Sequence, residues 1–546
     1  MFPTLRTTFL SLLLCAGGAL ASEADHREFD ATLNAPYHGE PAPGEPRTFS
    51  LAFDYPLVTA PQTVAWSLEL IAPDGRVARQ WTGEKALYRD PVDVDVRWDG
   101  RIGGDAAQAG IYRVRLVAAV GAGERVEQSW EIAVGRATVP AMPAFHALAR
   151  RSDARAMAPA PGSLPFDVYL GNLHSQTAHS DGGGDLATCT GAQEPQSSTH
   201  GPAEAFAYAR DHGLDLLVAS EHNHMYDGSA GTNSAATPAA AKALFRAGLS
   251  AAKDFNSAHP DFLAVYALEW GVIANGGHLN IFNSNRLLGW ERNGAGKLLA
   301  ESLTPKSDYA KLYTLMRQRG LVGQFNHPSQ SGQFLVNGVP FGYTQDGDAA
   351  MALCEVVNSN AFSTSTTESE TRRSNFEFAC NKALEAGFHV AFSTNQDNHC
   401  ANWGMSFTNR TGVLLPAGAA LTHTAFLDAL KARRVFATMD KGSQLVLTAN
   451  GHLMGERFVN SGPLSLVAHF ASTLGKAVSS VVMFEGVPGR NGTVAELSRT
   501  PVTTITPAAG EHFYYVRVTQ DDGNMLWSAP VWVTQQEGEE ARIFRH

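Results

Sequence analysis

Short apolar segments alternate with helical segments through the middle of this chain, and this alternation restricts the possible folds more than any other feature. The apolar segments lie at 168–170, 214–220, 263–269, 279–282, 321–326, 352–358 and 390–394. Helical patterns lie at 202–211, 238–254, 307–319, 370–385 and 424–434. Strands alternating with helices form parallel βα units, and seven strands are enough to close a barrel. We therefore predict a βα barrel over residues 165–440, with functional residues at the carboxyl ends of its strands.

Strand-like alternation of apolar and polar residues flanks this region on both sides. At 546 residues the chain is long enough for roughly three domains. Alternation at 45–135 is typical of a small β-sandwich, and its Trp98-Asp-Gly and Gly110-Ile-Tyr turns resemble immunoglobulin-like modules of secreted enzymes. Alternation returns at 443–536. We predict an Ig-like β-sandwich at 28–136, an Ala/Pro/Arg-rich linker at 137–164 and a C-terminal β-sandwich at 441–537.

The first 21 residues have the layout of a secretory signal peptide. Arg6 precedes an apolar stretch at 9–14 and a small-residue cleavage site at 19–21. Cys15 would suggest a lipoprotein, but leucines rather than small residues precede it. We expect cleavage near Ala21 and Ser22 and a protein that is secreted or periplasmic. No later segment approaches about 18 apolar residues, so we expect no membrane span.

The charge balance argues against a nucleic-acid duplex as partner. Lys and Arg number 42 and Asp and Glu 53, which gives a net charge of -11, and no basic run occurs. A phosphate-bearing substrate would need local attraction, most simply from metal ions.

Four cysteines remain after the leader, and in an oxidising compartment an even number permits two disulfides with three connectivities. Cys189 and Cys400 each follow a candidate site motif, so they could join two loops, which leaves Cys354 to pair with Cys380. Buried free thiols would fit the sequence equally well.

Residues able to bind a metal follow the predicted barrel strands in series. The metal-ligand candidates are His174, Asp181, His222, Glu269, His278, His327, Asp397 and His399. Imidazole and carboxylate suit Zn, Mn or Fe, and ligands from many strand ends converge only if the strands form a barrel. Other histidines have ordinary structural explanations as capping, surface or buried residues: His200, His212, His259, His389 and His423.

The order of these motifs resembles the polymerase and histidinol phosphatase (PHP) superfamily. The segments 432–438, 450–455 and 527–533 make the chain similar to a secreted metallohydrolase branch that includes carbaryl hydrolase. The resemblance covers roughly residues 165–535. It implies a distorted (β/α)7 barrel between the two sandwiches, with two or three divalent metal ions held by the eight candidates and activity mostly on phosphoesters.

One position departs from the superfamily pattern. Gln176 stands where the family has a second histidine, and a neutral amide binds transition metals poorly, so one of three metal sites would be weakened or empty. His179 could compensate as a ligand or could face solvent. Glu221 replaces the usual Asp beside His222, and we expect it to orient a ligand.

The expected function is a secreted phosphoesterase, on monoesters or diesters, that uses a metal-bound hydroxide. Glu269 is the candidate shared carboxylate between two cations, and His224 or His179 would protonate the leaving group. The substrate would be a small ester, phosphorylated in this interpretation. Two alternatives remain open: a carboxylester or carbamate hydrolase with the same metal site, and a degenerate barrel that only binds. The sequence does not indicate the oligomeric state.

Overall fold

The structure is a computed structural model. It describes residues 29–55, 58–88, 90–121, 124–136, 140–150, 164–272, 276–328 and 334–537. The predicted leader at 1–21 and most of the predicted linker at 137–164 lie outside the described residues.

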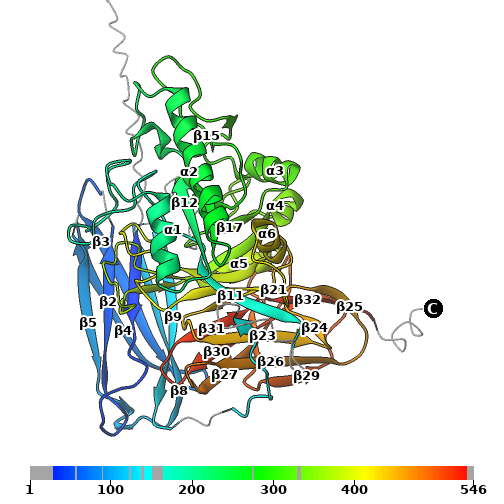
Figure 1. Ribbon diagram of the computed structural model, residues 1–546. Helices are drawn as coiled ribbons and strands as arrows, with labels where there is room; N and C mark the ends of the chain where they lie inside the picture. Colours follow the sequence, from blue (N-terminus) through cyan, green and yellow to red (C-terminus); the bar gives the residue numbers. More distant parts are fainter. Residues whose placement is uncertain are drawn as a thin grey trace, which may run out of the picture.

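The N-terminal part of the chain forms two antiparallel sheets that face each other, at the blue end of Figure 1. One has three strands: β1 (Asp30–Asn34), β2 (Arg47–Asp54) and β5 (Val92–Trp98). The other has four: β4 (Val77–Leu87), β3 (Gln62–Ile71), β8 (Gly110–Val120) and β9 (Glu124–Val134). A small ribbon is formed by β6 (Arg101–Ile102) and β7 (Asp105–Ala106). Strict alternation explains the packing, because Phe49, Leu51 and Phe53 of β2 are fully buried between more exposed neighbours.

A sheet of 17 strands is the largest element of the described molecule. Its central strands are β10 (Ala149–Arg150), β11 (Phe166–Asn172), β12 (Leu216–His222), β13 (Leu263–Val272), β14 (Gly277–Ile281), β17 (Gly323–Phe325), β18 (Met351–Ser359), β19 (Arg373–Asn375), β20 (Ala391–Asn395), β21 (Arg410–Pro416) and β22 (Val435–Thr438). Its C-terminal strands are β25 (Arg457–Asn460), β27 (Val478–Gly486), β28 (Ala495–Ser498), β30 (Gly510–Gln520), β31 (Met525–Ser528) and β32 (Val531–Gln535).

Most of the helices gather in the upper part of Figure 1. The helices are α1 (Pro202–Asp211), α2 (Pro238–Ala258), α3 (Tyr309–Arg319), α4 (Gln345–Ala350), α5 (Glu377–Ala386) and α6 (His423–Lys431), with a 3-10 turn η1 (Met225–Asp227). The remaining strands are the pair β15 (Leu288–Gly289) and β16 (Ser302–Leu303), and a sheet of β24 (His452–Leu453), β23 (Ser443–Ala449), β26 (Leu464–Ser472) and β29 (Val502–Ile505). No helix among the described residues is long and apolar enough to cross a bilayer.

The predicted fold class, a distorted (β/α)7 barrel between two β-sandwiches, is wrong. Strands predominate, and the described residues contain only six α-helices. The pairs β13–β14, β14–β17 and β11–β21 are antiparallel, and β22 pairs with β31, so the predicted barrel and C-terminal sandwich share one sheet.

The physical reason for the error lies in burial. All ten residues of β13 and all five of β14 are buried. Uninterrupted apolar strands suggest a parallel sheet, but antiparallel strands covered on both faces have the same pattern. The short connection from Val272 to Gly277 cannot hold a crossover helix, so β14 must return antiparallel to β13. The domain boundaries at 136, 164, 440 and 537 stay predictions.

Candidate metal centre

The candidate ligands lie on, or just after, strands of the large sheet. β12 ends at His222. The β13–β14 register pairs Glu269 with Asn280 and Gly271 with His278, so the carboxylate and the imidazole point to the same face. Seven of the eight candidate ligands are buried, and only His327 is half-buried.

The structure brings all eight metal-ligand candidates into three neighbouring groups. Within each group the ligand atoms lie within 4.8 Å of one another. The groups are His174, His327 and Asp397; Asp181, His222 and His399; and His222, Glu269 and His278. His222 belongs to two of the groups, and the contact between Glu269 Oε1 and His174 Nε2, at 3.0 Å, connects the third group to them.

Glu269 lies in the middle of this centre. Its Oε1 is 3.0 Å from His174 Nε2, 3.1 Å from His278 Nδ1 and 3.4 Å from His327 Nε2. Its Oε2 is 3.6 Å from His222 Nδ1. Burial alone would raise the pKa of Glu269, but the charges of the surrounding imidazoles outweigh it and hold that pKa well below its usual value. The carboxylate is therefore placed to be shared between two cations.

Two aspartates complete the centre. Asp181 Oδ1 lies 3.6 Å from His222 Nε2 and 3.5 Å from His399 Nε2. Asp397 Oδ1 lies 3.0 Å from His174 Nε2. Burial would raise the pKa of Asp397, but its pKa is lowered, chiefly by the charge of His174. The Asp397 carboxyl group is thus ionised, and both aspartates lie within reach of the candidate ligand imidazoles.

The backbone at two candidate ligands adopts the left-handed region, which non-glycine residues rarely enter. The φ angle is +25° at His327 and +50° at Asp397. Such conformations cluster at functional sites, because the surrounding structure must hold them.

The spacing of the donor atoms fits a bound divalent ion. Two ligands about 2.0–2.1 Å from one tetrahedral Zn²⁺ lie about 3.3–3.4 Å apart. The separations that Asp181 and Glu269 make with the surrounding imidazoles run from 3.0 to 3.6 Å. Buried imidazoles and carboxylates at this spacing, from separate strands, are the donor set that Zn, Mn and Fe prefer.

Gln176 takes part in the centre without offering an imidazole. Its amide Nε2 donates a hydrogen bond to Glu269 Oε2. Its backbone carbonyl accepts a hydrogen bond from Trp403 Nε1 at 2.8 Å, which fixes the loop. The side chain that departs from the superfamily pattern therefore holds the central carboxylate.

Glu221 holds the loop that carries the candidate ligand Asp181. Its carboxylate accepts hydrogen bonds from Thr177 N at 3.1 Å, Thr177 Oγ1 at 2.6 Å and Ser180 Oγ at 2.6 Å. Burial raises its pKa to about 7. These bonds fix the turn that leads to Asp181.

The two predicted proton donors lie outside the three groups. His179 Nδ1 is 2.7 Å from Tyr266 Oη, and burial lowers the pKa of His179 to about 4. The ring of His224 is stacked on Trp290 with ring centroids 5.9 Å apart, and it lies 5.9 Å from the ring of His222. Of the two, His224 is the one whose ring neighbours a candidate ligand, His222.

The histidines given structural explanations also lie outside the three groups. His212 stacks on Tyr208 at the end of α1, and His259 is the C-cap residue of α2. His389 Nδ1 lies 2.9 Å from Asp348 Oδ1, away from the centre.

Glu355 and Asn326 belong to the centre although sequence reasoning gave neither a role. Glu355 Oε1 lies 3.3 Å from His174 Nδ1, and its Oε2 accepts a 2.7 Å hydrogen bond from the backbone N–H of His327. Asn326 Nδ2 donates to Glu269 Oε1 at 2.8 Å. The available signal was a lone acid inside the apolar run 352–357, since buried carboxylates almost always have partners.

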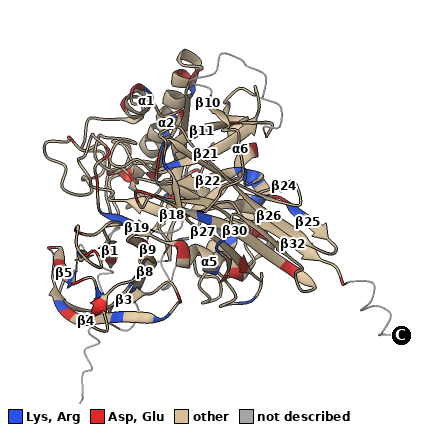
Figure 2. Cartoon of the chain, turned by 90° about the horizontal axis from the view of Figure 1, so that it is seen from below, with Lys and Arg blue, Asp and Glu red and all other residues tan. Residues whose placement is uncertain are grey.

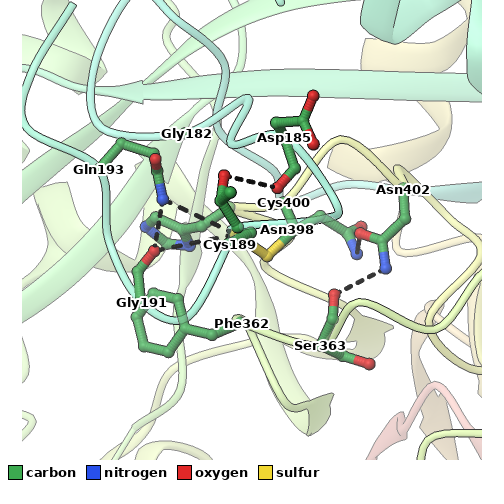
Figure 3. The surroundings of a disulfide bond; sticks show 12 residues. Gly182, Asp185, Cys189, Gly191, Gln193, Phe362, Ser363, Asn398, Cys400 and Asn402 are labelled. Carbon is green, nitrogen blue, oxygen red and sulfur yellow. Dashed lines mark hydrogen bonds between the residues drawn. A yellow bond between two sulfur atoms is a disulfide. The ribbon is translucent and has the colours of Figure 1, made fainter. Parts of the chain in front are cut away.

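Both predicted disulfides are confirmed. Cys189 is bonded to Cys400 and Cys354 to Cys380. Figure 3 shows the first, which joins the loop after Gly182 to the segment that follows His399. Gly184 N donates to the His399 carbonyl at 3.0 Å, so the bond and this contact hold two ligand-bearing loops together.

Comparisons with known proteins identify no family. No family model and no curated protein matches the chain. Solved structures similar to it include a β-glucuronidase from Bacteroides uniformis, with 10% identity over 93% of this chain and 61% of that one, at a TM-score of 0.15. A putative β-galactosidase from Bacteroides fragilis has 8% identity over 94% of this chain and 74% of that one, at 0.14. A Parabacteroides merdae β-glucuronidase has 7% identity over 94% and 64%, at 0.16.

These findings overturn the resemblance to the PHP superfamily. No model of that superfamily, or of any other family, matches the chain. The PHP-type metallohydrolase assignment, and the phosphoesterase function taken from it, are therefore wrong as predictions. The chain spans 61% of the length of the Bacteroides uniformis enzyme. Likenesses at these TM-scores transfer neither fold nor activity to this chain.

Proposed function

We propose that this centre binds two or three divalent transition-metal ions, Zn, Mn or Fe, and that the protein is a metal-dependent hydrolase. The observation that carries the proposal is the convergence of eight imidazole and carboxylate ligands into three groups that His222 and the His174–Glu269 contact connect. Ion pairs alone rarely gather so many buried histidines around one carboxylate, because burying charge without a strong compensating partner is costly.

The chain supplies the charge and the rigidity that this chemistry needs. Bound divalent cations would acidify a coordinated water and polarise a substrate carbonyl or ether oxygen. Glu269 stays ionised between the imidazoles, and the hydrogen bonds from Gln176 and Asn326 fix its two oxygens. The loops carrying Asp181 and His399 are held by Cys189–Cys400.

His224 is our candidate for protonating the leaving group. Its ring is buried, lies against Trp290 and neighbours His222. A position beside a ligand, rather than among the ligands, suits a group that transfers a proton to substrate.

Metal content tests the first half of the proposal. Protein stripped with EDTA and restored with Zn²⁺ should hold at least two ions per chain by elemental analysis. His327→Ala and Asp397→Asn should each lower that number by about one, whereas His452→Gln, on an exposed histidine, should not. Less than one tightly bound ion per chain in the restored wild-type protein would reject the metal centre.

Turnover tests the second half. Hydrolysis of at least one member of a panel of p-nitrophenyl esters, anilides and glycosides should disappear with EDTA and return with Zn²⁺ or Mn²⁺. A glycosidase that works through a pair of carboxyl groups needs one of them protonated and no metal. Turnover that survives complete metal removal would therefore contradict the proposed function.

A further inference from the structure

A cavity of about 160 Å³ separates the metal centre from the N-terminal sheets. Its wall on the N-terminal side includes Phe29 and Val126, and its opposite wall includes Phe362. His327 and Asp397 also line it, so one side of the cavity is part of the candidate metal centre. The strands β1, β9 and β19 come together here, as Figure 2 shows from below. A substrate in this cavity would touch both parts of the molecule.

Arg373, the first residue of β19, lines this cavity. The surroundings of its side chain are unusual for an arginine. Its guanidinium carbon lies 5.2 Å from the ring centroid of Trp130 and 4.8 Å from that of Phe407. Its Nε–H is buried and donates no hydrogen bond to any described residue, and no described carboxylate forms an ion pair with it. Burial lowers the pKa of Arg373 to about 10, so it stays charged at neutral pH.

The neighbouring Arg372 is different, which makes Arg373 the residue to explain. Arg372 is about half exposed, and its Nη2 lies 3.8 Å from Asp93 Oδ1. A guanidinium held between two aromatic faces and open to a cavity has its fork of N–H donors fixed in position. Such a fork matches a planar carboxylate, which would accept hydrogen bonds from the guanidinium, including from the Nε–H that no described residue accepts.

The other residues of the wall restrict the anion further. Asp30, Asp54 and Asp397 line the same cavity, so a group with two negative charges would be repelled. Phe29 and Phe362 offer apolar surface beside the guanidinium. The cavity is also smaller than the roughly 300–1,000 Å³ typical of drug-sized ligands.

We propose that Arg373 is the anchor for a small, singly charged carboxylate with an apolar body, held so that the rest of the substrate reaches His327 and Asp397. This inference rests on the proposed function and adds the substrate class: a monocarboxylic acid derivative. The N-terminal sheets are then part of the substrate site, through Trp130 and the apolar wall, and not a detached module.

Ligand binding tests this assignment without relying on turnover. Isothermal titration at pH 7 should show binding of benzoate and at least tenfold weaker binding of benzamide, its neutral counterpart of the same shape. Arg373→Met keeps an apolar side chain between the rings and should weaken benzoate binding by about ten- to hundredfold. Arg373→Lys, which keeps the charge, should retain part of the affinity and guards against misfolding. Arg76→Met, on an exposed arginine of a turn, should bind as the wild type does.

Metal removal separates this inference from the proposed function. With EDTA-treated protein, benzoate should still bind through Arg373, whereas a carboxylate held only by metal ions would be released. Arg373-dependent binding in a protein that holds no metal would reject the metal centre and leave this inference standing. Equal affinities for benzoate and benzamide, no benzoate binding to folded wild-type protein, or full binding by Arg373→Met would overturn it.

Discussion

Glu355 illustrates how single buried residues set the properties of the candidate centre. Its side chain is fully buried, and its Oε1 also accepts a 2.9 Å hydrogen bond from Asn395 Nδ2. The carboxylate of Glu355 also contacts Nδ1 of His174, the ring nitrogen that faces away from Glu269, and it accepts a hydrogen bond from the backbone N–H of His327, whose φ angle is positive. A carboxylate that engages the far side of a ligand imidazole fixes its tautomer and raises its basicity.

Glu355→Gln should therefore weaken metal binding without removing a ligand. We expect affinity for Zn²⁺, measured by competition with a chromophoric chelator, to fall about ten- to hundredfold. Glu84→Gln, on an exposed glutamate of β4, serves as the control. A change smaller than twofold in Glu355→Gln would show that the carboxylate only fills space.

At the scale of elements, the pair β27–β30 carries a pH-sensitive contact. His512 Nδ1 lies 2.9 Å from Glu485 Oε1, and His512 Nε2 lies 3.0 Å from the Ala508 carbonyl. Because both ring nitrogens face acceptors, the protonated imidazole is favoured. The hydrogen bond with Glu485 accordingly raises the pKa of His512 above its usual value.

The sign of the pH effect follows from this raised pKa. The contact of protonated His512 with Glu485 stabilises the fold fully at a pH below the pKa of histidine in the unfolded chain, about 6.5. This stabilisation is lost as the pH rises through the pKa of His512 in the folded protein. His512→Gln should thus lower the unfolding free energy by about 1 kcal/mol at pH 6 and by much less at pH 9, as measured by urea denaturation. His452→Gln, in an exposed pair with Glu456, should show no such difference. An equal loss at both pH values would exclude a charged His512.

The two disulfides close loops of very different length, with sequence separations of 211 for Cys189–Cys400 and 26 for Cys354–Cys380. In the chain-entropy description the longer loop contributes about 2 kcal/mol more. Replacing Cys189 and Cys400 by Ser should therefore lower the melting temperature more than replacing the other pair. Calorimetry on the two double variants checks this order, and the reverse order would show that local packing outweighs loop entropy.

At the scale of the whole molecule, a buried ionic triad joins three regions of the chain. Arg517 of β30 lies between Glu131 of β9, at 2.9 Å, and Glu377 of α5, at 2.5 Å. Thr519 Oγ1 and Tyr515 Oη donate to the same two carboxylates. The N-terminal sheets are thus locked onto the large sheet, which keeps the walls of the cavity beside the metal centre in place.

Arg517→Met should be strongly destabilising, because it leaves two buried carboxylates without a cation. The expected loss is about 3–5 kcal/mol. A triple variant that also carries Glu131→Gln and Glu377→Gln should recover most of it, since no unpaired charge remains. Thermal unfolding of the three proteins measures both effects. Failure of the triple variant to recover would mean that the triad acts through shape rather than charge.

Local chemistry in the sequence was enough to find part of this architecture. Pro202 followed by Glu204 marks the start of a helix, and α1 begins there. The eight candidate ligands were also identifiable, because few other roles explain those residue types in series after strands. The cysteine pairing was one of three connectivities, and free thiols fitted the sequence equally well. Arg373 could not be identified in this way, since nothing near it in the sequence reveals Trp130, 243 positions away, or Phe407.

The sequence by itself determined which side chains could bind metal and where many of the strands lie, because these depend on residue type and short-range periodicity. The prediction from sequence missed β21 and placed a helix at 370–385, where β19 precedes the shorter α5. Only the tertiary structure decided strand direction, the merging of central and C-terminal strands into one sheet, and the cavity between the centre and the N-terminal sheets. The physical reason is that strand pairing and burial on two faces come from contacts between distant residues. A buried apolar strand has the same composition whichever way its neighbour runs.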